Sequence, residues 1–175
     1  GNQPIGHGIA IEEECDMALR KIAYIEDDIL RKKSRKVETF DERLHVLLDD
    51  MAETMYKNNG CGLAAPQVSV LRRAIVMDVG EGLIEVVNPE IVSREGEVDG
   101  VEGCLSVPGR QGYVLRPQKV VVRGQDRNGK PIELTCEDWL ARCACHEIDH
   151  LDGRLYVDIM HEEVFQTDEA EEEKS

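Results

Sequence analysis

The sequence is short of positive charge and has no long hydrophobic run, and each absence argues against a class of protein. Its 175 residues include 21 lysines and arginines against 36 aspartates and glutamates, which gives a formal net charge of −15. Nucleic acids and anionic membrane surfaces would both repel such a chain. No apolar stretch approaches the roughly 18 residues that a membrane-spanning helix needs. The N-terminus also lacks a basic start followed by an apolar segment, so we expect no secretory signal.

The negative charge is concentrated at the two ends of the chain. Residues 1–16 carry a net charge of −4 and residues 161–175 carry −6, whereas residues 17–160 carry only −5. A hydrophobic content of 41% over this length suits one globular domain with its own core. We therefore predict an N-terminal extension over 1–16, disordered or partly an expression remnant. A single domain over 17–160 and an acidic C-terminal tail over 161–175 follow, with disorder in the last ten residues.

The cysteines do not form the dense pattern of a small disulfide-rich scaffold. A chain of this length can bury a core without disulfides, so a reducing compartment is the simpler interpretation. Most of the thiols are expected to be small buried hydrophobic groups. The six positions are Cys15, Cys61, Cys104, Cys136, Cys143 and Cys145.

Two segments have the hydrophobic periodicity of a helix. The first covers residues 39–60, where Thr39 and Glu42 have the spacing of a capping box. The second runs over residues 137–152 and is followed by Gly153, a typical helix stop. The apolar stripe of the first segment is formed by Leu44, Leu47, Leu48, Met51 and Met55.

The middle of the chain is rich in short β-branched stretches, which predict strands. Asn88 with Pro89, and residues 126–129, are turn signals that separate some of them. Most connections are too short for a crossover helix, which favours antiparallel pairing and an α+β fold over a doubly wound sheet. The predicted strands cover residues 74–79, 83–87, 90–93, 120–124 and 132–135.

The second predicted helix contains an HExxH sequence, His146-Glu147-Ile148-Asp149-His150. Histidines four positions apart lie on one face of a helix, where they can bind one metal ion while the glutamate reaches a water. An incidental histidine pair on a solvated helix face is the alternative. A metal site would need a third ligand, and the next histidine, His161, comes eleven positions after His150. The cysteines remain as candidates, since a thiolate is a strong ligand for Zn²⁺ or Fe²⁺.

Two further short motifs accompany the HExxH sequence. Residues 60–67 read Gly-Cys-Gly-Leu-Ala-Ala-Pro-Gln, residues 102–106 read Glu-Gly-Cys-Leu-Ser, and residues 146–153 read HEIDHLDG. Together they resemble, in the same order, the motifs GxGLAAPQ, EGCLS and HExDHxxG of the peptide deformylase family, and the resemblance extends over residues 22–158. It implies an α+β fold in which small antiparallel or mixed sheets pack around a central HExxH helix.

The resemblance also implies an activity and a set of site residues. Deformylases remove the N-formyl group from the initiator N-formylmethionine of new polypeptides and release formate. In this sequence Cys104, His146 and His150 would bind the metal, and Glu147 would act as general acid and base. The formyl oxygen would be stabilised by the Gln67 amide and the backbone N–H of Leu105. Substrate would lie beside Gly60, Cys61, Gly62 and Cys143, with Trp139 a weaker candidate for the pocket wall.

The expected cofactor and partners follow from the same resemblance. One divalent metal is implied, Fe²⁺ in the cell, although two histidines and a cysteine would also accept Zn²⁺, Ni²⁺ or Co²⁺. The expected partners are N-formylmethionyl nascent peptides, met near the ribosome in the bacterial cytoplasm. The acidic C-terminus argues against direct binding to ribosomal RNA. We expect a monomer with no membrane association.

Two other functions are compatible with parts of the pattern. A zincin-type endopeptidase would use the same HExxH sequence, but this sequence offers no third metal ligand other than Cys104. A catalytically silent homologue would only bind nascent N-termini, and it would have no need for Glu147, which is present.

Overall fold

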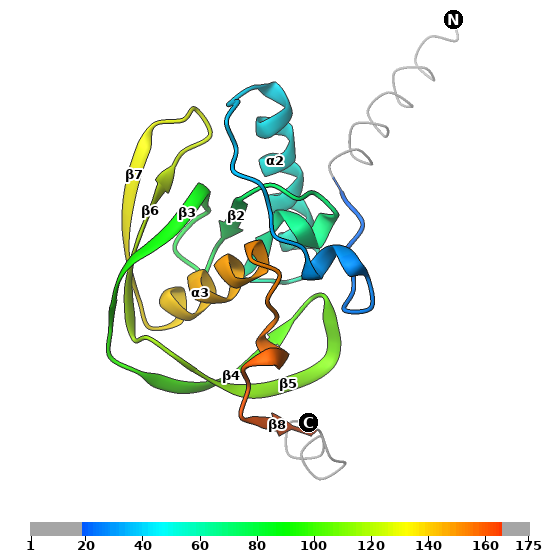
Figure 1. The fold of residues 1–175 in the computed structure, drawn as a ribbon, viewed down its shortest axis with the longest axis vertical. Helices are drawn as coiled ribbons and strands as arrows, with labels where there is room; N and C mark the ends of the chain where they lie inside the picture. The colour runs from blue at the N-terminus through cyan, green and yellow to red at the C-terminus, as the bar shows by residue number, and fades with distance from the viewer. Residues whose placement is uncertain (1–18, 166–175) are drawn as a thin grey trace, which may run out of the picture.

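The computed structural model describes residues 19–165, and the structural statements below concern these residues. Helix α3 lies in the middle of the molecule, and strands of two separate sheets surround it (Figure 1). Within the described chain, no helix is both long and apolar enough to cross a bilayer. The α-helices are α2 (Glu42–Lys57) and α3 (Trp139–Leu151), and the 3₁₀-helices are η1 (Asp28–Arg31), η2 (Ala65–Val68) and η3 (Tyr156–Asp158).

Two antiparallel sheets form the β part of the fold, which confirms the predicted α+β class. The larger sheet has the order β1-β2-β3-β6-β7 and the smaller one the order β4-β5-β8. Every pairing between these strands is antiparallel. The strands are β1 (Gly62–Ala64), β2 (Ala74–Met77), β3 (Ile84–Glu95), β4 (Val98–Cys104), β5 (Val107–Arg116), β6 (Lys119–Gln125), β7 (Pro131–Glu137) and β8 (Glu162–Val164).

The β1–β2 end of the larger sheet is buried on both faces because a helix covers each of them. Along β2, Ile75 and Met77 belong to the core cluster with α3, whereas Ala74 and Val76 belong to the cluster with α2. Successive side chains of a strand point to opposite faces, so one short strand contributes to both clusters. The sheet therefore fixes the position of α3 from one side, and the smaller sheet contacts the same helix through β5.

The predicted helix over residues 39–60 is present but shorter, and its predicted cap is wrong. Helix α2 begins at Glu42 with Asp41 as the N-cap, whose carboxylate accepts a hydrogen bond of 3.1 Å from the backbone N–H of Leu44. Thr39 lies two residues too early to cap this end. The second helix begins at Trp139 rather than residue 137, because Glu137 still pairs with Lys119 in the sheet.

The turn predicted at Asn88 and Pro89 is wrong, because β3 runs through it. Asn88 has a φ of 54°, and the pairing with β6 shifts register between Val87 and Glu90. The Asn88 amide donates to Val37 O at 2.9 Å and accepts from Val37 N at 2.8 Å, which holds this bulge in place. A bulge lets the strand bend without ending.

The start of the predicted C-terminal tail belongs to the smaller sheet. Residues Glu162–Val164 form β8, which pairs with β5, and the Arg110 guanidinium forms an ion pair of 2.9 Å with Glu163. Pairing to an existing strand edge orders an acidic stretch that has no strand signal of its own. The predicted extension over residues 1–16 and the rest of the tail, from residue 166 onward, lie outside the described residues.

Candidate active site and metal centre

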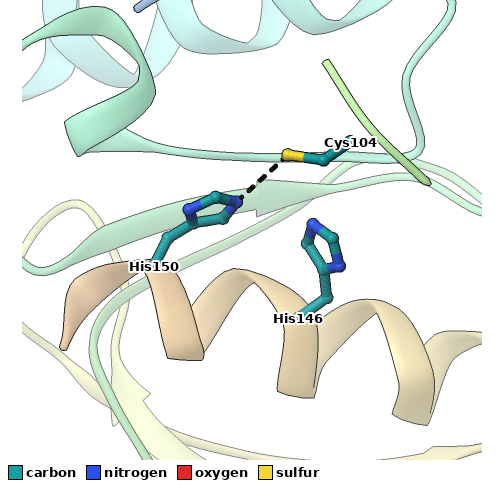
Figure 2. Close-up of side chains that lie close together, drawn as sticks. All are labelled: Cys104, His146 and His150. Carbon is teal, nitrogen blue, oxygen red and sulfur yellow. Dashed lines mark hydrogen bonds between the residues drawn. The ribbon is translucent and has the colours of Figure 1, made fainter. Parts of the chain in front are cut away.

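Helix α3 and the end of β4 bring together three side chains that could hold a metal ion (Figure 2). His146 and His150 lie one turn apart on the helix, and Cys104 is the last residue of β4. The Cys104 Sγ lies 3.4 Å from Nε2 of His150, and one ligand atom from each of the three residues lies within 4.8 Å of the others. The sulfur and both rings therefore face a common point.

The chemistry of these donors fits a divalent transition metal. Burial holds the pKa of His150 well below its usual range, so its imidazole is neutral, as a metal ligand must be. The second ring nitrogen of His150, Nδ1, is buried without a hydrogen-bond partner among residues 19–165. Two imidazole nitrogens and one thiolate match the three protein ligands of catalytic sites that leave a coordination position open.

Glu102, on β4, fixes the orientation of His146. Its Oε1 accepts a hydrogen bond of 2.9 Å from Nδ1 of His146, which leaves the other nitrogen, Nε2, for the metal. Arg116 donates to both Glu102 oxygens at 2.8 and 2.9 Å. Burial would raise the pKa of Glu102, but the hydrogen bonds from Arg116 and His146 outweigh it and lower that pKa to about 2. The carboxylate therefore stays ionised.

Two buried arginines connect Glu102 to the surrounding elements. Arg142, on α3, donates to Glu102 at 2.8 Å and to the carbonyl oxygens of Val98 and Val114. Arg116, on β5, also donates to Asp149 of α3 at 2.7 Å. These bonds tie β4 and β5 to the helix that carries both histidines. A small displacement of β4 and β5 relative to α3 would therefore change the positions of the side chains at the candidate metal centre.

Glu147 is buried beside the histidines and has a perturbed carboxyl. It is 4% exposed, and its Oε1 has no hydrogen-bond partner within residues 19–165. Burial raises the pKa of Glu147 to about 8. A carboxyl with a pKa near neutrality can both accept and return a proton, which is the property that a general acid and base needs.

Gln67, on η2, is held in a single orientation by its neighbours. Its Oε1 accepts a hydrogen bond of 3.0 Å from the backbone N–H of Ala64. The amide nitrogen Nε2 then points to the metal centre, where it donates to Ser106 Oγ at 3.1 Å and to Cys104 Sγ at 3.5 Å. A buried amide fixed in this way is a ready donor for an oxygen bound nearby.

A cavity of about 430 Å³ joins these groups. Its wall includes nine of the ten predicted site residues, and the tenth, His150, reaches the centre through its contact with Cys104. Trp139 also lines the cavity and is 52% exposed, so it does not belong to the core. The nine are Gly60, Cys61, Gly62, Gln67, Cys104, Leu105, Cys143, His146 and Glu147.

Gly62 has a steric role at this site. A Cβ at Gly62 would lie 2.6 Å from Oε2 of Glu147 and 2.8 Å from Sγ of Cys143, which is closer than such atoms approach. Gly60 is less constrained, with Leu105 Cδ1 at 3.0 Å from the corresponding position. Absence of a side chain at Gly62 therefore lets β1 pass directly over α3.

Sequence reasoning missed the three residues that position the metal centre: Glu102, Arg116 and Arg142. Glu102 belongs to the Glu-Gly-Cys-Leu-Ser motif, but the motif alone does not indicate its role. Its place two residues before Cys104 offers only a weak signal, because the pairing of β4 with β5 shifts register between these two residues, which interrupts regular alternation. The arginines lie on different elements, so nothing in the linear sequence relates them to Glu102.

Comparisons with known proteins agree with this geometry. The sequence profile of the polypeptide deformylase family matches residues 19–166. A peptide deformylase of Caldicellulosiruptor bescii is 66% identical over 142 residues, which is 81% of this chain and 86% of its relative. Crystal structures of peptide deformylases from Legionella pneumophila and Thermotoga maritima are 52% and 40% identical, with TM-scores of 0.79 and 0.80. They cover 81% of this chain and 86% and 97% of their own chains. The chain therefore belongs to the polypeptide deformylase family.

Proposed function

We propose that this enzyme hydrolyses the N-formyl group of N-formylmethionyl peptides and releases formate, with the residues around Cys104 as its active site. The observation that carries the proposal is the convergence of two histidines, one cysteine, a buried carboxyl and a fixed amide on one cavity. Membership of the deformylase family supports the reaction class.

The metal would be held by Cys104, His146 and His150. When bound, a divalent metal supplies Lewis acidity that makes a water nucleophilic near neutral pH. Glu102 keeps His146 in the tautomer that presents Nε2. Burial keeps His150 neutral.

Glu147 would handle the protons of the reaction. Its carboxyl lies at the cavity wall, one residue from a metal ligand, and burial raises its pKa to about 8. A positive charge beside it would lower that pKa, so the group would be ionised when the metal is present. It would take a proton from the attacking water and deliver it to the departing amine.

Gln67 and Leu105 would stabilise the negative charge that develops on the formyl oxygen. The Gln67 amide nitrogen is aimed at the centre because its oxygen is held by Ala64. Leu105 follows Cys104 in the chain, so its backbone N–H belongs to the same turn between β4 and β5. Donors that are fixed in advance stabilise such charge without reorganisation.

The peptide would lie along residues 60–62 and be recognised mainly through its backbone. These residues line the cavity, and β1, which begins at Gly62, is an edge strand of the larger sheet, to which a peptide backbone could pair. The methionine side chain would enter the part of the cavity near Cys143. Backbone recognition suits an enzyme that acts on many different nascent proteins.

We further propose Fe²⁺ as the metal in the cell, with Zn²⁺, Ni²⁺ and Co²⁺ accepted by the same donors. The enzyme would act as a monomer in the bacterial cytoplasm, close to the ribosome but without binding its RNA. An acidic chain of net charge −15 supports the last point, because nucleic acid would repel it.

The two alternative functions are not favoured by the comparisons. The relatives at up to 66% identity are named peptide deformylases, which argues against a zincin-type endopeptidase. A silent peptide-binding module would have no use for a buried glutamate beside the metal centre, and Glu147 is present there.

The test is formate release from formyl-Met-Ala-Ser by anaerobically purified enzyme. Samples loaded with Fe²⁺, Ni²⁺ or Co²⁺ should all turn over, and Glu147→Gln should retain metal while losing activity. Absence of formate from every loaded sample would reject the proposed function. Cleavage of internal bonds in unformylated peptides would instead revive the endopeptidase.

A further inference from the structure

Two thiols lie together in the active-site cavity without a part in the proposed chemistry. Cys61 precedes β1 and is half-buried, and Cys143, on α3, is 4% exposed. Both line the cavity, and both are reduced in the structure. The Cys143 thiol donates a hydrogen bond of 3.3 Å to the carbonyl oxygen of Cys61. The two residues are 82 positions apart in the sequence, so the fold creates this contact.

The distance between them is suitable for a disulfide. The carbonyl oxygen of a residue lies about 2.4 Å from its own Cα. The Cys143 Sγ, at 3.3 Å from that oxygen, is therefore no more than about 6 Å from the Cα of Cys61. The two thiols also lie within side-chain hydrogen-bond reach of each other. Rotation of the two side chains would therefore bring the sulfurs toward the S–S bonding distance of about 2.0 Å.

The two thiols also differ in reactivity. Proximity to the Cys143 thiol, which can donate to a thiolate, outweighs burial and lowers the pKa of Cys61 to about 6. The same contact and burial raise the pKa of Cys143 well above its usual range. Cys61 is also the more exposed of the pair, so an oxidant in the cavity meets it first.

We propose that hydrogen peroxide or an organic hydroperoxide converts Cys61 and Cys143 into a reversible disulfide that closes the active site. The Cys61 sulfur attacks the peroxide oxygen, which gives a sulfenic acid and one water or alcohol. The Cys143 sulfur then attacks the Cys61 sulfur, and the hydroxide that leaves takes up the Cys143 proton as water. Two thiols and one peroxide thus give one disulfide and two molecules of water, or one of water and one of alcohol. The thiols are oxidised and the peroxide is reduced.

Inhibition by this disulfide rests on the proposed function, because it concerns the same cavity. The new bond would draw Cys61 toward α3, over the surface where we place the peptide. It would also remove the hydrogen bond that the Cys143 thiol donates to the carbonyl oxygen of Cys61. The backbone N–H of Asp78 donates to the same oxygen at 2.9 Å. The disulfide would therefore fill part of the pocket and shift the main chain that the substrate meets. A dithiol reductant would reverse both effects.

The test uses reduced, nickel-loaded full-length enzyme treated with stoichiometric hydrogen peroxide and then with an alkylating agent. Intact mass should show the loss of two hydrogens and of two alkylation sites, and peptide mapping should link Cys61 to Cys143. Deformylation should fall at least about tenfold and return with dithiothreitol. Because the mass is read without substrate, failure of the disulfide is distinguishable from failure of the proposed function.

Matched variants assign the effect to this pair. Neither Cys61→Ser nor Cys143→Ala can form this disulfide. After peroxide treatment, the intact mass of each variant should show no loss of two hydrogens. The activity of each, compared with its own reduced form, should show no reversible inactivation. Cys136→Ala, which removes a buried thiol from the core cluster on β7, should still form the disulfide. A disulfide that maps to Cys15, or oxygen added to Cys104 without any cross-link, would overturn the proposal. A cross-linked enzyme with unchanged turnover would overturn its inhibitory part.

Discussion

At the scale of single residues, the metal centre depends most on Cys104, the ligand candidate that lies outside the helix. Its sulfur faces His150 at 3.4 Å, and replacing it would leave two protein donors. We expect Cys104→Ala to lower metal affinity at least about 100-fold, more than the loss of an outer partner does. Metal content after gel filtration measures this. Cys145→Ala is the control, because Cys145 is a buried thiol that belongs to the core cluster instead. Near-stoichiometric metal in Cys104→Ala would reject its assignment as a ligand.

Glu102 is the second residue on which the site depends, and its loss should affect stability as well as metal binding. Its carboxylate faces Arg116, Arg142 and His146, all within 2.9 Å. Glu102→Gln would leave the buried Arg142 without its counter-charge and Arg116 with Asp149 alone, at a cost of about 3–5 kcal/mol in the free energy of unfolding. Metal affinity should fall about 10–100-fold, since His146 loses its partner.

Urea denaturation and metal titration test both parts of this prediction. Glu133→Gln is the matched control, because Glu133 also pairs with an arginine, Arg123, but on the exposed surface. It should leave metal affinity unchanged and have little effect on stability. Equal urea midpoints for the two variants would show that the buried network does not support the fold.

At the scale of secondary structure, the stability of the larger sheet depends on the apolar face of α2. Leu48 is fully buried in the cluster that covers β2. Leu48→Ala should lower the free energy of unfolding by about 2–5 kcal/mol, through lost burial and a residual cavity. Val46→Ala, on the same helix but 42% exposed, should change it by less than about 0.5 kcal/mol. Similar urea midpoints for the two variants would contradict this role of α2.

The passage of β1 over α3 gives a second prediction at this scale. A Cβ at Gly62 would meet Glu147 at 2.6 Å and Cys143 at 2.8 Å. Gly62→Ala should therefore displace Glu147, the proposed general base, and lower kcat about 100-fold, as misplacement by about 1 Å does elsewhere. In Gly103→Ala the nearest atom would be at 3.5 Å, an ordinary contact. Stopped-time assays of formate should thus find the larger loss in Gly62→Ala, and equal losses would contradict the steric argument.

Some elements were predictable from the sequence and others were not, for reasons that lie in particular residues. Helix α2 was predictable because its buried leucines and methionines recur at helical spacing. Strands β4 and β5 were not, because they contain Gly100, Gly103, Gly109 and Gly112, which have low strand propensity. Pairing between these strands, rather than local preference, makes them extended. The three motifs led to the residues around the cavity, but the contacts of Glu102 depend on the tertiary fold.

At the scale of the whole molecule, the site lies where the layers of the fold meet. The larger sheet holds α3 from one side, and β4 and β5 reach the same helix through Glu102 and the buried arginines. The proposed metal ligands therefore come from two layers, α3 and the smaller sheet. Any process that separates the smaller sheet from α3 would remove Cys104 from the histidines. We thus expect metal binding and the docking of this sheet to stabilise one another.

The two ends of the described chain are also joined, by an ion pair between η1 and η3. Nη1 of Arg31 lies 2.6 Å from Oδ2 of Asp158, and the same oxygen accepts from Leu155 N at 2.9 Å. Burial would raise the pKa of Asp158, but the hydrogen bonds from Arg31 and Leu155 lower it below its usual range. The unfolded chain therefore binds this proton more readily than the folded one, and the pair stabilises the fold above the ordinary pKa of an aspartate.

Asp158→Asn should accordingly reduce stability at pH 7 and not at strongly acid pH. Both partners are more than one-third exposed, so the expected loss at pH 7 is below about 1 kcal/mol. The difference from wild type should shrink as the pH falls below the ordinary pKa of an aspartate, and it should vanish once the pH is below the lowered pKa of Asp158. Urea titrations of both proteins at several pH values measure it. A difference that is the same at pH 3 and pH 7 would mean that the ion pair contributes nothing, and that the asparagine perturbs η3 by its shape alone.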